Sequence, residues 1–403
     1  MRLLIVALIF LNSTSLSGQF MSLLSGKKDA TFNFSAEHDF ILVKVRFANV
    51  LPLNFIFDTG SEHTILFKKE YADLLGVTYD RKIPLFGADL ADQIYAYIAR
   101  GVELNVDGQV QFSSDVLVME ADYLQLEEFT GINIDGILGA NLFRHLVLEI
   151  DNKKDRITLI APNTFKPPKR YMRFDVQVQQ SKPYITTSAS VGGEKIELKL
   201  LLDTGASLPL LLYTNTHSNL ELPPNTILGN LGMGLGGFLQ GYVGRVQYLD
   251  FAQYRFDNLV TSFQDIRLDS LMTNQVGRNG IIGNSLLSRY NVVIDYNKSD
   301  LYLKPNRKFR KKFRYDKSGL TIVATGADLK SFIIQRVVPD SPGEEAGFKQ
   351  GDLIKSMKGI PASFYTLAAL NSALSSKVGK VVKIVVSRNG VRMKKKLKLR
   401  ELI

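Results

Sequence analysis

Up to residue 305, apolar and polar residues alternate along the chain as they do in β-strands. Clear examples are the segments 40–46, 155–160 and 195–200, in which apolar side chains alternate or run together between Gly and Asn turns. Helical periodicity before residue 360 is confined to short stretches such as 68–75 and 140–144. This pattern predicts a mainly β protein with short connecting helices.

One strand-and-turn pattern occurs twice. Residues 53–61, LNFIFDTGS, recur as residues 198–206, LKLLLDTGA. Residues 135–142, DGILGANL, recur as residues 279–286, NGIIGNSL, and each copy continues into an apolar strand that ends in Asp. The offset is 145 residues between the two Asp-Thr-Gly segments and 144 residues between the two glycine segments. Two markers with nearly the same offset predict a duplicated β domain.

A different pattern begins after residue 305. Residues 306–317 contain seven Lys and Arg residues and one Asp, which predicts a basic linker. Beyond the linker we expect a strand from residue 320, another at 332–338, an amphipathic helix at 365–374 and a hairpin around the Asn389-Gly390 turn. The chain is therefore divided into a leader (1–18), a first β domain (19–165), a second β domain (166–305), the linker (306–317) and a small β-rich α+β unit (318–403).

The leader has the pattern of a secretory signal peptide. Met1-Arg2 supplies positive charge, residues 3–11 form an apolar run too short to span a membrane, and small polar residues follow. A buried first strand is the alternative interpretation. We expect export to the periplasm, the cell surface or the medium.

Composition and charge narrow the chemistry. The 403 residues are 45% hydrophobic and 22% charged, as in a globular protein of two or three domains. Without cysteine, disulfides, thiolate metal sites and cysteine nucleophiles are excluded. The four histidines lie far apart and form no HExxH pattern, so we expect no metal and no other cofactor.

The net charge of +11 is concentrated in the C-terminal quarter of the chain. Residues 304–403 contain 23 Lys and Arg residues against 7 Asp and Glu residues. This basic tail could bind an anionic surface, and an ordinary solvated charged surface is the alternative. Export argues against a nucleic-acid partner.

Each Asp-Thr-Gly follows an apolar run and so places a carboxylate at the end of a buried strand. Gly60 and Gly205 allow a tight turn in which backbone N–H groups point back at the carboxylate, and Thr59 and Thr204 add hydroxyl groups. A buried carboxylate without such partners would be costly. The paired turns therefore indicate two supported carboxylates, and turns that only cap strands are the alternative.

Together these markers resemble the retropepsin and pepsin-like aspartic proteases over roughly residues 35–305. The resemblance implies two β-barrel lobes and a catalytic dyad, Asp58 and Asp203, which shares one proton and activates a water molecule. It also implies an extended peptide or protein substrate in the cleft between the lobes. Under this resemblance the residues that support the dyad are Thr59, Gly60, Ser61, Thr204 and Gly205.

The second turn departs from the pepsin pattern, because Ala206 stands where the first turn has Ser61. We expect the missing hydroxyl to remove a hydrogen bond from Asp203 and so to raise its pKa. The rate optimum should then be less acidic than that of pepsin.

Proteases of this kind cover the cleft with a β-hairpin flap, and two segments fit that role. Residues 86–97 contain Tyr95 and Tyr97, either of which could be the flap tyrosine. Residues 228–244 contain seven glycines in 17 residues, as a mobile hairpin requires. A flexible surface hairpin without function is the alternative for the second segment. Its central candidates are Gly234, Gly236 and Gly237.

Residues 318–403 resemble a PDZ domain of the bacterial protease-associated kind through Ser341-Pro342, Ala346-Gly347-Phe348 and Gly351-Asp352-Leu353-Ile354. The resemblance implies that a peptide C-terminus binds at one loop and adds to the sheet edge. The loop has Thr in place of its usual second glycine, and a scaffold that only docks within the molecule is the alternative. The residues of this loop are Gly319, Leu320, Thr321 and Ile322.

The whole pattern predicts an exported aspartic endopeptidase with a PDZ domain that binds peptide or regulates access. The alternative is a non-catalytic peptide-binding or scaffold protein that retains the protease fold.

Overall fold

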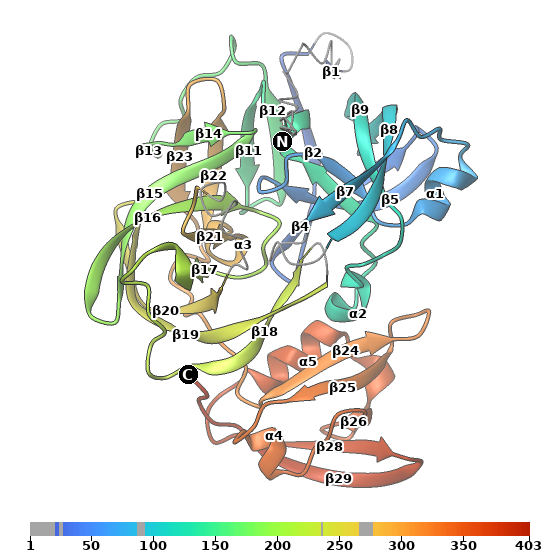
Figure 1. Ribbon diagram of the computed structural model, residues 1–403, viewed down its shortest axis with the longest axis vertical. Coiled ribbons are helices and arrows are strands. Elements are labelled where there is room, and N and C mark those ends of the chain that lie inside the picture. Colours follow the sequence, from blue (N-terminus) through green and yellow to red (C-terminus); the bar gives the residue numbers. More distant parts are fainter. Residues whose placement is uncertain (1–20, 24–26, 87–92, 235–236, 266–276) are drawn as a thin grey trace, which may run out of the picture.

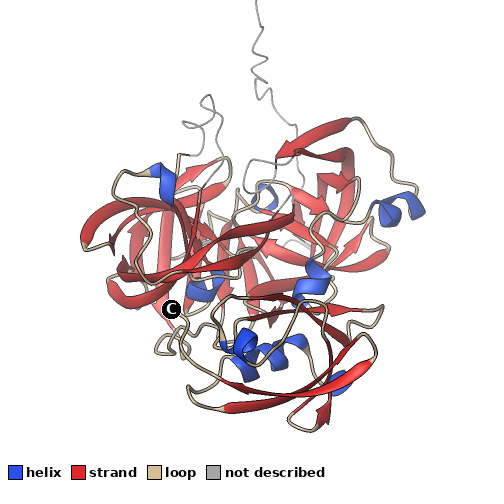
Figure 2. Ribbon diagram, turned by 60° about the horizontal axis from the view of Figure 1, so that its bottom comes forward, coloured by secondary structure: helices blue, strands red, loops and turns tan. Residues whose placement is uncertain are grey.

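The computed structural model describes residues 21–23, 27–86, 93–234, 237–265 and 277–403. The predicted leader, residues 1–18, lies outside the described residues, and so does Gly236 of the glycine-rich hairpin. The protein is mainly β, as predicted, with short helices between the strands (Figures 1 and 2). No helix in the described ranges is long and apolar enough to cross a membrane.

Six strands of the first half form a closed β barrel. The ring closes because β8 pairs with both β4 and β9. Strand β7 (Lys82–Phe86) extends the sheet beyond β8, and β1 (Met21–Leu23) and β3 (Ser35–Glu37) pair at its edges. In ring order the strands are β4 (Phe40–Phe47), β5 (Leu51–Asp58), β10 (Gly136–Gly139), β6 (Thr64–Leu66), β9 (Val110–Met119) and β8 (Gln93–Val106).

The second half forms a barrel with the same strand order. Its ring closes through β15 and β19, and β18 (Ile227–Gly234) extends β19 as β7 extends β8. Both barrels contain two parallel pairs at equivalent places. The duplication predicted from the sequence is therefore present in the topology. In ring order the strands are β15 (Lys182–Val191), β16 (Glu194–Asp203), β21 (Gly280–Gly283), β17 (Leu210–Tyr213), β20 (Tyr254–Gln264) and β19 (Gly237–Phe251), with β14 (Gln177–Gln179) pairing at the edge.

A six-stranded sheet joins the two barrels. At its centre β11 from the first half pairs antiparallel with β22 from the second half, with Leu148 opposite Ile294. Apolar side chains of both halves belong to one buried cluster, including Phe57 and Leu202 directly before the two Asp-Thr-Gly turns. The turns are thus anchored in a common core. The strands of this sheet are β13 (Met172–Asp175), β23 (Asp300–Pro305), β22 (Tyr290–Asp295), β11 (Val147–Asp151), β12 (Arg156–Ile160) and β2 (Asp29–Asn33).

The basic segment 306–317 is packed against the second barrel. The Phe309 ring lies 4.6 Å from the Tyr254 ring and 5.4 Å from the Tyr290 ring, measured between centroids. The Arg289 guanidinium lies 3.3 Å from the centroid of Phe313. Two phenylalanines in a basic stretch therefore convert the predicted linker into an ordered strap.

The C-terminal unit is a separate, smaller sheet with its own buried cluster. The predicted amphipathic helix is α5 (Leu367–Leu374), and the Asn389-Gly390 turn joins two paired strands as expected. The strands are β24 (Leu320–Thr325), β25 (Ser331–Val337), β26 (Leu353–Met357), β27 (Ile360–Pro361), β28 (Val381–Arg388) and β29 (Val391–Lys398), and α4 (Pro342–Glu345) lies between β25 and β26.

Short helix α2 (Leu126–Thr130) of the first half packs against β24, beside α5 (Figure 1). At Gly131, which follows α2, an added Cβ would lie only 2.9 Å from the Cβ of Leu367. The C-terminal unit therefore contacts the first barrel at close range. The remaining helices are α1 (Lys69–Leu74) and α3 (Asn284–Leu287).

Candidate active site

The two Asp-Thr-Gly turns meet where the barrels face each other. Strand β5 ends at Asp58 and pairs in parallel with β10, which places Gly139 opposite Asp58. Strand β16 ends at Asp203 and pairs in the same way with β21, which places Gly283 opposite Asp203. Each carboxylate thus emerges at the end of a buried parallel pair, as the sequence predicted.

The carboxyl groups of Asp58 and Asp203 lie close together, each against the glycine of the opposite turn. The backbone N–H of Gly60 donates to Asp58 Oδ1 at 2.6 Å, and the N–H of Ser61 donates to the same oxygen at 3.1 Å. In the second turn the N–H of Gly205 donates to Asp203 Oδ1 at 2.8 Å. The predicted turns, with N–H groups directed back at the carboxylates, are present in both halves.

Thr59 and Thr204 link the two turns by four hydrogen bonds. The Thr59 hydroxyl donates to the Leu202 carbonyl at 2.7 Å and accepts from the Thr204 N–H at 3.1 Å. The Thr204 hydroxyl donates to the Phe57 carbonyl at 2.7 Å and accepts from the Thr59 N–H at 3.1 Å. Both threonines are buried, with exposed fractions of 0% and 3%. This reciprocal link fixes the separation of the two carboxyl groups.

The two glycines of the turns are needed for close approach between the barrels. A Cβ on Gly60 would lie 2.4 Å from Asp203 Cγ, and a Cβ on Gly205 would lie 2.3 Å from Asp58 Cγ. Real Cβ atoms do not approach other atoms so closely, so any side chain here would push the opposite carboxylate away. Each turn therefore makes room for the carboxylate of the other turn.

The electrostatics of the pair are asymmetric. Burial raises the pKa of Asp58, and the neighbouring Asp203 raises this pKa further. Burial also raises the pKa of Asp203, whereas the neighbouring Asp58 carboxyl, the Gly205 N–H and the Arg278 guanidinium all act to lower it. Because the pKa of both groups is raised and the two groups interact, they titrate as a pair that can hold one shared proton.

The expected cause of a raised Asp203 pKa was wrong. The Ser61 hydroxyl donates to the His63 carbonyl at 2.9 Å, and because a hydroxyl carries one proton it does not also donate to Asp58. The backbone N–H groups of Ser61 and Ala206 perform the same role in the two turns. The absence of a hydroxyl at Ala206 therefore costs Asp203 no hydrogen bond, and burial is the main cause of its shift.

The dyad lies in a cavity of about 470 Å³. One wall comes from the first barrel and is mainly apolar, with Ile56, Leu117 and Ile137 among its members, although Glu62 and His63 line it too. The opposite wall comes from the second barrel and combines apolar side chains with Lys182 and Arg278. A cleft between two barrels, open to solvent and centred on paired carboxyl groups, can accommodate an extended chain.

Sequence reasoning missed both of these cations. Arg278 directly precedes the Asn279-Gly280 marker of the second copy, and its counterpart in the first copy is Ile134. The two markers have the same structural role: Asp135 Oδ2 accepts from the Asn54 N–H at 2.8 Å, and Asn279 Oδ1 accepts from the Lys199 N–H at 2.9 Å. When the two copies are compared position by position, Arg278 is therefore a charged residue at a place where the first copy has an apolar one.

The two flap candidates differ in their relation to the cavity. In β8, Ile94 and Ala96 belong to the buried cluster that contains Ile56 and Ile137 of the apolar wall. Tyr95 and Tyr97 alternate with them and so lie on the opposite face, with the Tyr97 hydroxyl donating to Glu120. Neither tyrosine lines the cavity, so the flap-tyrosine role stays a prediction.

The glycine-rich hairpin does reach the cavity. Strands β18 and β19 pair along their length, with Gly234 opposite Gly237 at the end of the described hairpin. Leu231 of β18 and Leu239 of β19 line the dyad cavity. The role of this hairpin as a flap over the substrate stays a prediction.

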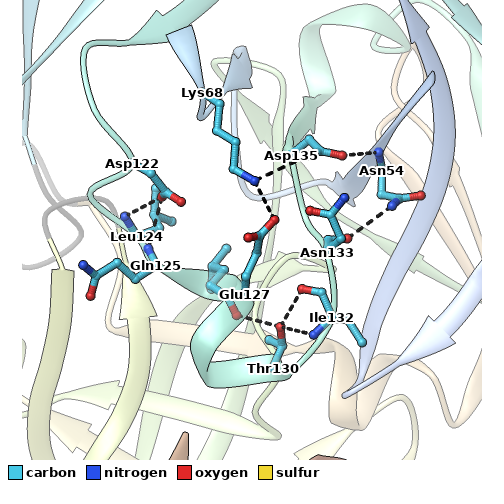
Figure 3. Close-up of polar contacts among 11 residues, drawn as sticks. Asn54, Lys68, Asp122, Leu124, Gln125, Glu127, Thr130, Ile132, Asn133 and Asp135 are labelled. Carbon is cyan, nitrogen blue, oxygen red and sulfur yellow. Dashed lines mark hydrogen bonds and ion pairs between the residues drawn. The ribbon is translucent and has the colours of Figure 1, made fainter. Parts of the chain in front are cut away.

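A charged network supports the wall next to the C-terminal unit (Figure 3). Lys68 Nζ lies 2.7 Å from Glu127 Oε1 on α2 and 3.9 Å from Asp135 Oδ1. The adjoining residues Leu124 and Leu126 line the dyad cavity. Helix α2 therefore contacts the C-terminal unit on one side and contributes to the cavity on the other.

The candidate peptide-binding loop of the C-terminal unit lies at β24, the edge strand of its sheet. Gly319 has a φ of 73°, and the side chains of Leu320 and Ile322 are buried, whereas Thr321 is half-buried. Helix α2 contacts the same strand. In this structure the edge that a peptide would use is thus approached by the protein itself.

Within the ranges given above, no three His, Asp or Glu side chains gather as a metal site would require.

Comparison with protein families gives a match in the first half of the chain. The model of the family described as aspartyl protease matches residues 43–142, which include the first Asp-Thr-Gly turn and strand β10. Over this stretch the chain is similar to aspartyl proteases, which supports a protease function. Comparison with curated proteins gave no match.

Proposed function

We propose that the protein is an aspartic endopeptidase in which Asp58 and Asp203 act as the catalytic dyad. The observation that carries this proposal is the close approach of the two carboxyl groups, each against the glycine of the opposite turn, in a cavity open to solvent. The family match over the first turn supports it. The equivalent geometry of the second turn supplies the second carboxylate.

In the proposed mechanism the ionised Asp203 accepts a proton from a water molecule, whose oxygen attacks the peptide carbonyl carbon. The protonated Asp58 donates its proton to the carbonyl oxygen, so that a neutral tetrahedral diol forms. The proton now on Asp203 then passes to the amide nitrogen as the C–N bond breaks, and Asp58 recovers a proton from the diol. Neither aspartate forms a covalent bond with the substrate.

The test is mass-spectrometric mapping of cuts in a peptide mixture by the purified full-length protein and its variants. Asp58→Asn and Asp203→Asn should each reduce cleavage by about 10²–10⁴-fold, because each removes a group that transfers a proton. Asp115→Asn is the matched control, since Asp115 lies on β9 outside the cavity and accepts from the Gly101 N–H.

Unchanged cleavage in either dyad variant would refute the mechanism. Peptide binding without any cleavage by the wild type would instead indicate a non-catalytic peptide-binding protein. Tyrosine fluorescence of each variant checks that it is folded.

We further propose that the C-terminal unit regulates access to the cavity. The support is α2, which packs against β24 and is adjoined by cavity residues. The loop Gly319–Ile322 would then bind a peptide C-terminus in competition with α2. A peptide that binds this loop should therefore change the cleavage rate, and a rate that is independent of such a peptide would contradict the proposal.

Two further proposals concern location. Residues 1–18 direct export, which cell fractionation with and without this segment tests. The basic residues of the 306–317 strap and the C-terminal unit attract an anionic surface. Binding to anionic vesicles should then weaken as salt increases, and binding that ignores salt would contradict the electrostatic idea.

A further inference from the structure

Two cations lie in the dyad cavity and are not used by the proposed mechanism. Arg278 lies two residues before the start of β21, and Lys182 is the first residue of β15. Both side chains line the cavity together with Asp58 and Asp203. Among the described residues, neither cation has a carboxylate within ion-pair distance, although both lie close enough to the dyad to interact with it electrostatically.

Arg278 is held in place by neutral groups. Its Nη2 donates to the Tyr213 hydroxyl at 3.2 Å, and Tyr184 lies close enough to interact with it electrostatically. Its Nε is buried and has no hydrogen-bond partner in the described part of the structure. A guanidinium presents five N–H donors in a fixed planar fork. Burying a guanidinium without an anion beside it is costly. Such a group is therefore prepared for an anion that is not part of the chain.

Lys182 has a related environment. Burial lowers its pKa, while Glu62 at the mouth of the first turn and the more distant dyad favour its charged form. Arg278 is near enough to repel it. Two like charges gathered in one partly buried wall gain most when a single anion lies between them.

The first barrel offers no such group at the equivalent place. The counterpart of Arg278 is Ile134, whose side chain is buried in the apolar cluster of the first barrel. The Lys and Arg side chains among the described lining residues, Lys182 and Arg278, thus both lie on the side of Asp203, whereas the side of Asp58 combines apolar side chains with Glu62 and His63. An extended substrate would meet these two walls on opposite sides of the bond to be cleaved.

We propose that Lys182 and Arg278 form a carboxylate-binding subsite beside the dyad, so that the protein prefers peptides with an acidic group close to the cleaved bond. This inference rests on the proposed protease function. The carboxylate is either an Asp or Glu side chain or the C-terminal carboxylate of the substrate, since both present the same planar pair of oxygens to a guanidinium.

The experiment measures kcat/KM for paired peptides that differ only in Glu or Gln at each position flanking the cut, and in a free or amidated C-terminus. The full-length wild type is compared with Arg278→Met, Lys182→Met and the control Arg156→Met, whose residue is exposed on β12 and remote from the cavity lining. Because a hydrogen-bonded charge pair is lost, the preference for the carboxylate should fall by about 10- to 100-fold in Arg278→Met. It should fall less in Lys182→Met and remain unchanged in the control.

Each outcome decides the question. Loss of a Glu-over-Gln preference identifies a side-chain carboxylate, and loss of a free-over-amidated preference identifies the terminal carboxylate. A wild type with no preference for either carboxylate overturns the subsite. A shift of the pH profile in Arg278→Met that is equal for Glu and Gln peptides, with their ratio unchanged, also overturns it, because Arg278 would then only tune Asp203.

The subsite has a readout that does not need cleavage. Fluorescence anisotropy of the same labelled peptides on Asp58→Asn protein compares affinities for Glu and Gln directly. If the wild type cuts nothing but this variant prefers the acidic peptide, the protease proposal fails and the subsite stands. Equal affinities overturn the subsite whatever the activity.

Discussion

Replacing Thr204 by Val tests whether the reciprocal threonine link holds the two turns together. Valine has nearly the same shape but removes the hydroxyl that accepts from the Thr59 N–H and donates to the Phe57 carbonyl. A buried donor left without a partner costs about 1–3 kcal/mol, and the carbonyl, which has a second lone pair, contributes less. We expect the free energy of unfolding to fall by about 2–4 kcal/mol. Thr204→Ser keeps the hydroxyl and should lose only about 1 kcal/mol with the buried methyl group.

The chain is suited to this measurement. It has no Trp and 16 Tyr residues, of which only Tyr365 follows residue 317, so tyrosine fluorescence in urea reports on the two barrels. At a slope of about 2–3 kcal/mol per M, the expected loss moves the urea midpoint by about 1 M. Thr59→Val should give a shift of equal size because its contacts mirror those of Thr204. Equal midpoints for Thr204→Val and Thr204→Ser would show that the link does not stabilise the fold.

Two further predictions follow from the same structure. Gly131→Ala should free the C-terminal unit from the first barrel and speed proteolysis of segment 306–317, because the new Cβ would press on Leu367. Gly76→Ala is the control: Gly76 has the same φ of 67°, and nothing lies within 4 Å of its added Cβ. This control introduces only the backbone strain and should leave the proteolysis of segment 306–317 unchanged. Asp58→Asn should stabilise the fold at neutral pH. The pKa of Asp58 is higher in the folded protein than in the unfolded chain, so this residue makes the wild type less stable as pH rises from the unfolded towards the folded pKa. An Asn side chain cannot ionise and therefore does not cause this loss. The urea midpoint of Asp58→Asn should therefore exceed that of the wild type at neutral pH and approach it near pH 3. If the midpoint of the variant, relative to that of the wild type, is lower at neutral pH than near pH 3, the sign of this prediction is wrong.

The barrels and the pair of Asp-Thr-Gly turns could be predicted because their signals are local and repeated. An apolar run followed by Asp-Thr-Gly specifies a buried strand and a turn through its own residues, and its recurrence 145 residues later indicates the second copy. The packing of the 306–317 strap was missed, because seven basic residues dominate its composition while Phe309 and Phe313 determine where it lies. The contact between α2 and β24 was missed for another reason, since it joins segments about 190 residues apart that carry no common pattern.

The cationic wall could not be predicted from residue type alone. A single Arg before a strand is most often a surface residue, and only the fold brings Arg278 beside Tyr213 and into the cavity. The face of β8 that packs towards the cavity was also not specified, because alternation defines two faces without saying which one is buried beside the dyad. Here Ile94 and Ala96 occupy that face in place of the two tyrosines.

Because the two Asp-Thr-Gly turns are nearly identical, the single charged side chain of Arg278 can distinguish one turn from the other. Two identical turns would hold a shared proton equally on either carboxyl. The backbone contacts of the turns are nearly the same in both copies, so they supply little distinction. Arg278 favours the ionised form of Asp203 and has an apolar counterpart in the first copy, so it makes the two carboxyl groups unequal. If the side chain that we propose to recognise an acidic substrate also distinguishes the two aspartates, substrate preference and the pH dependence of cleavage should change together when Arg278 is replaced.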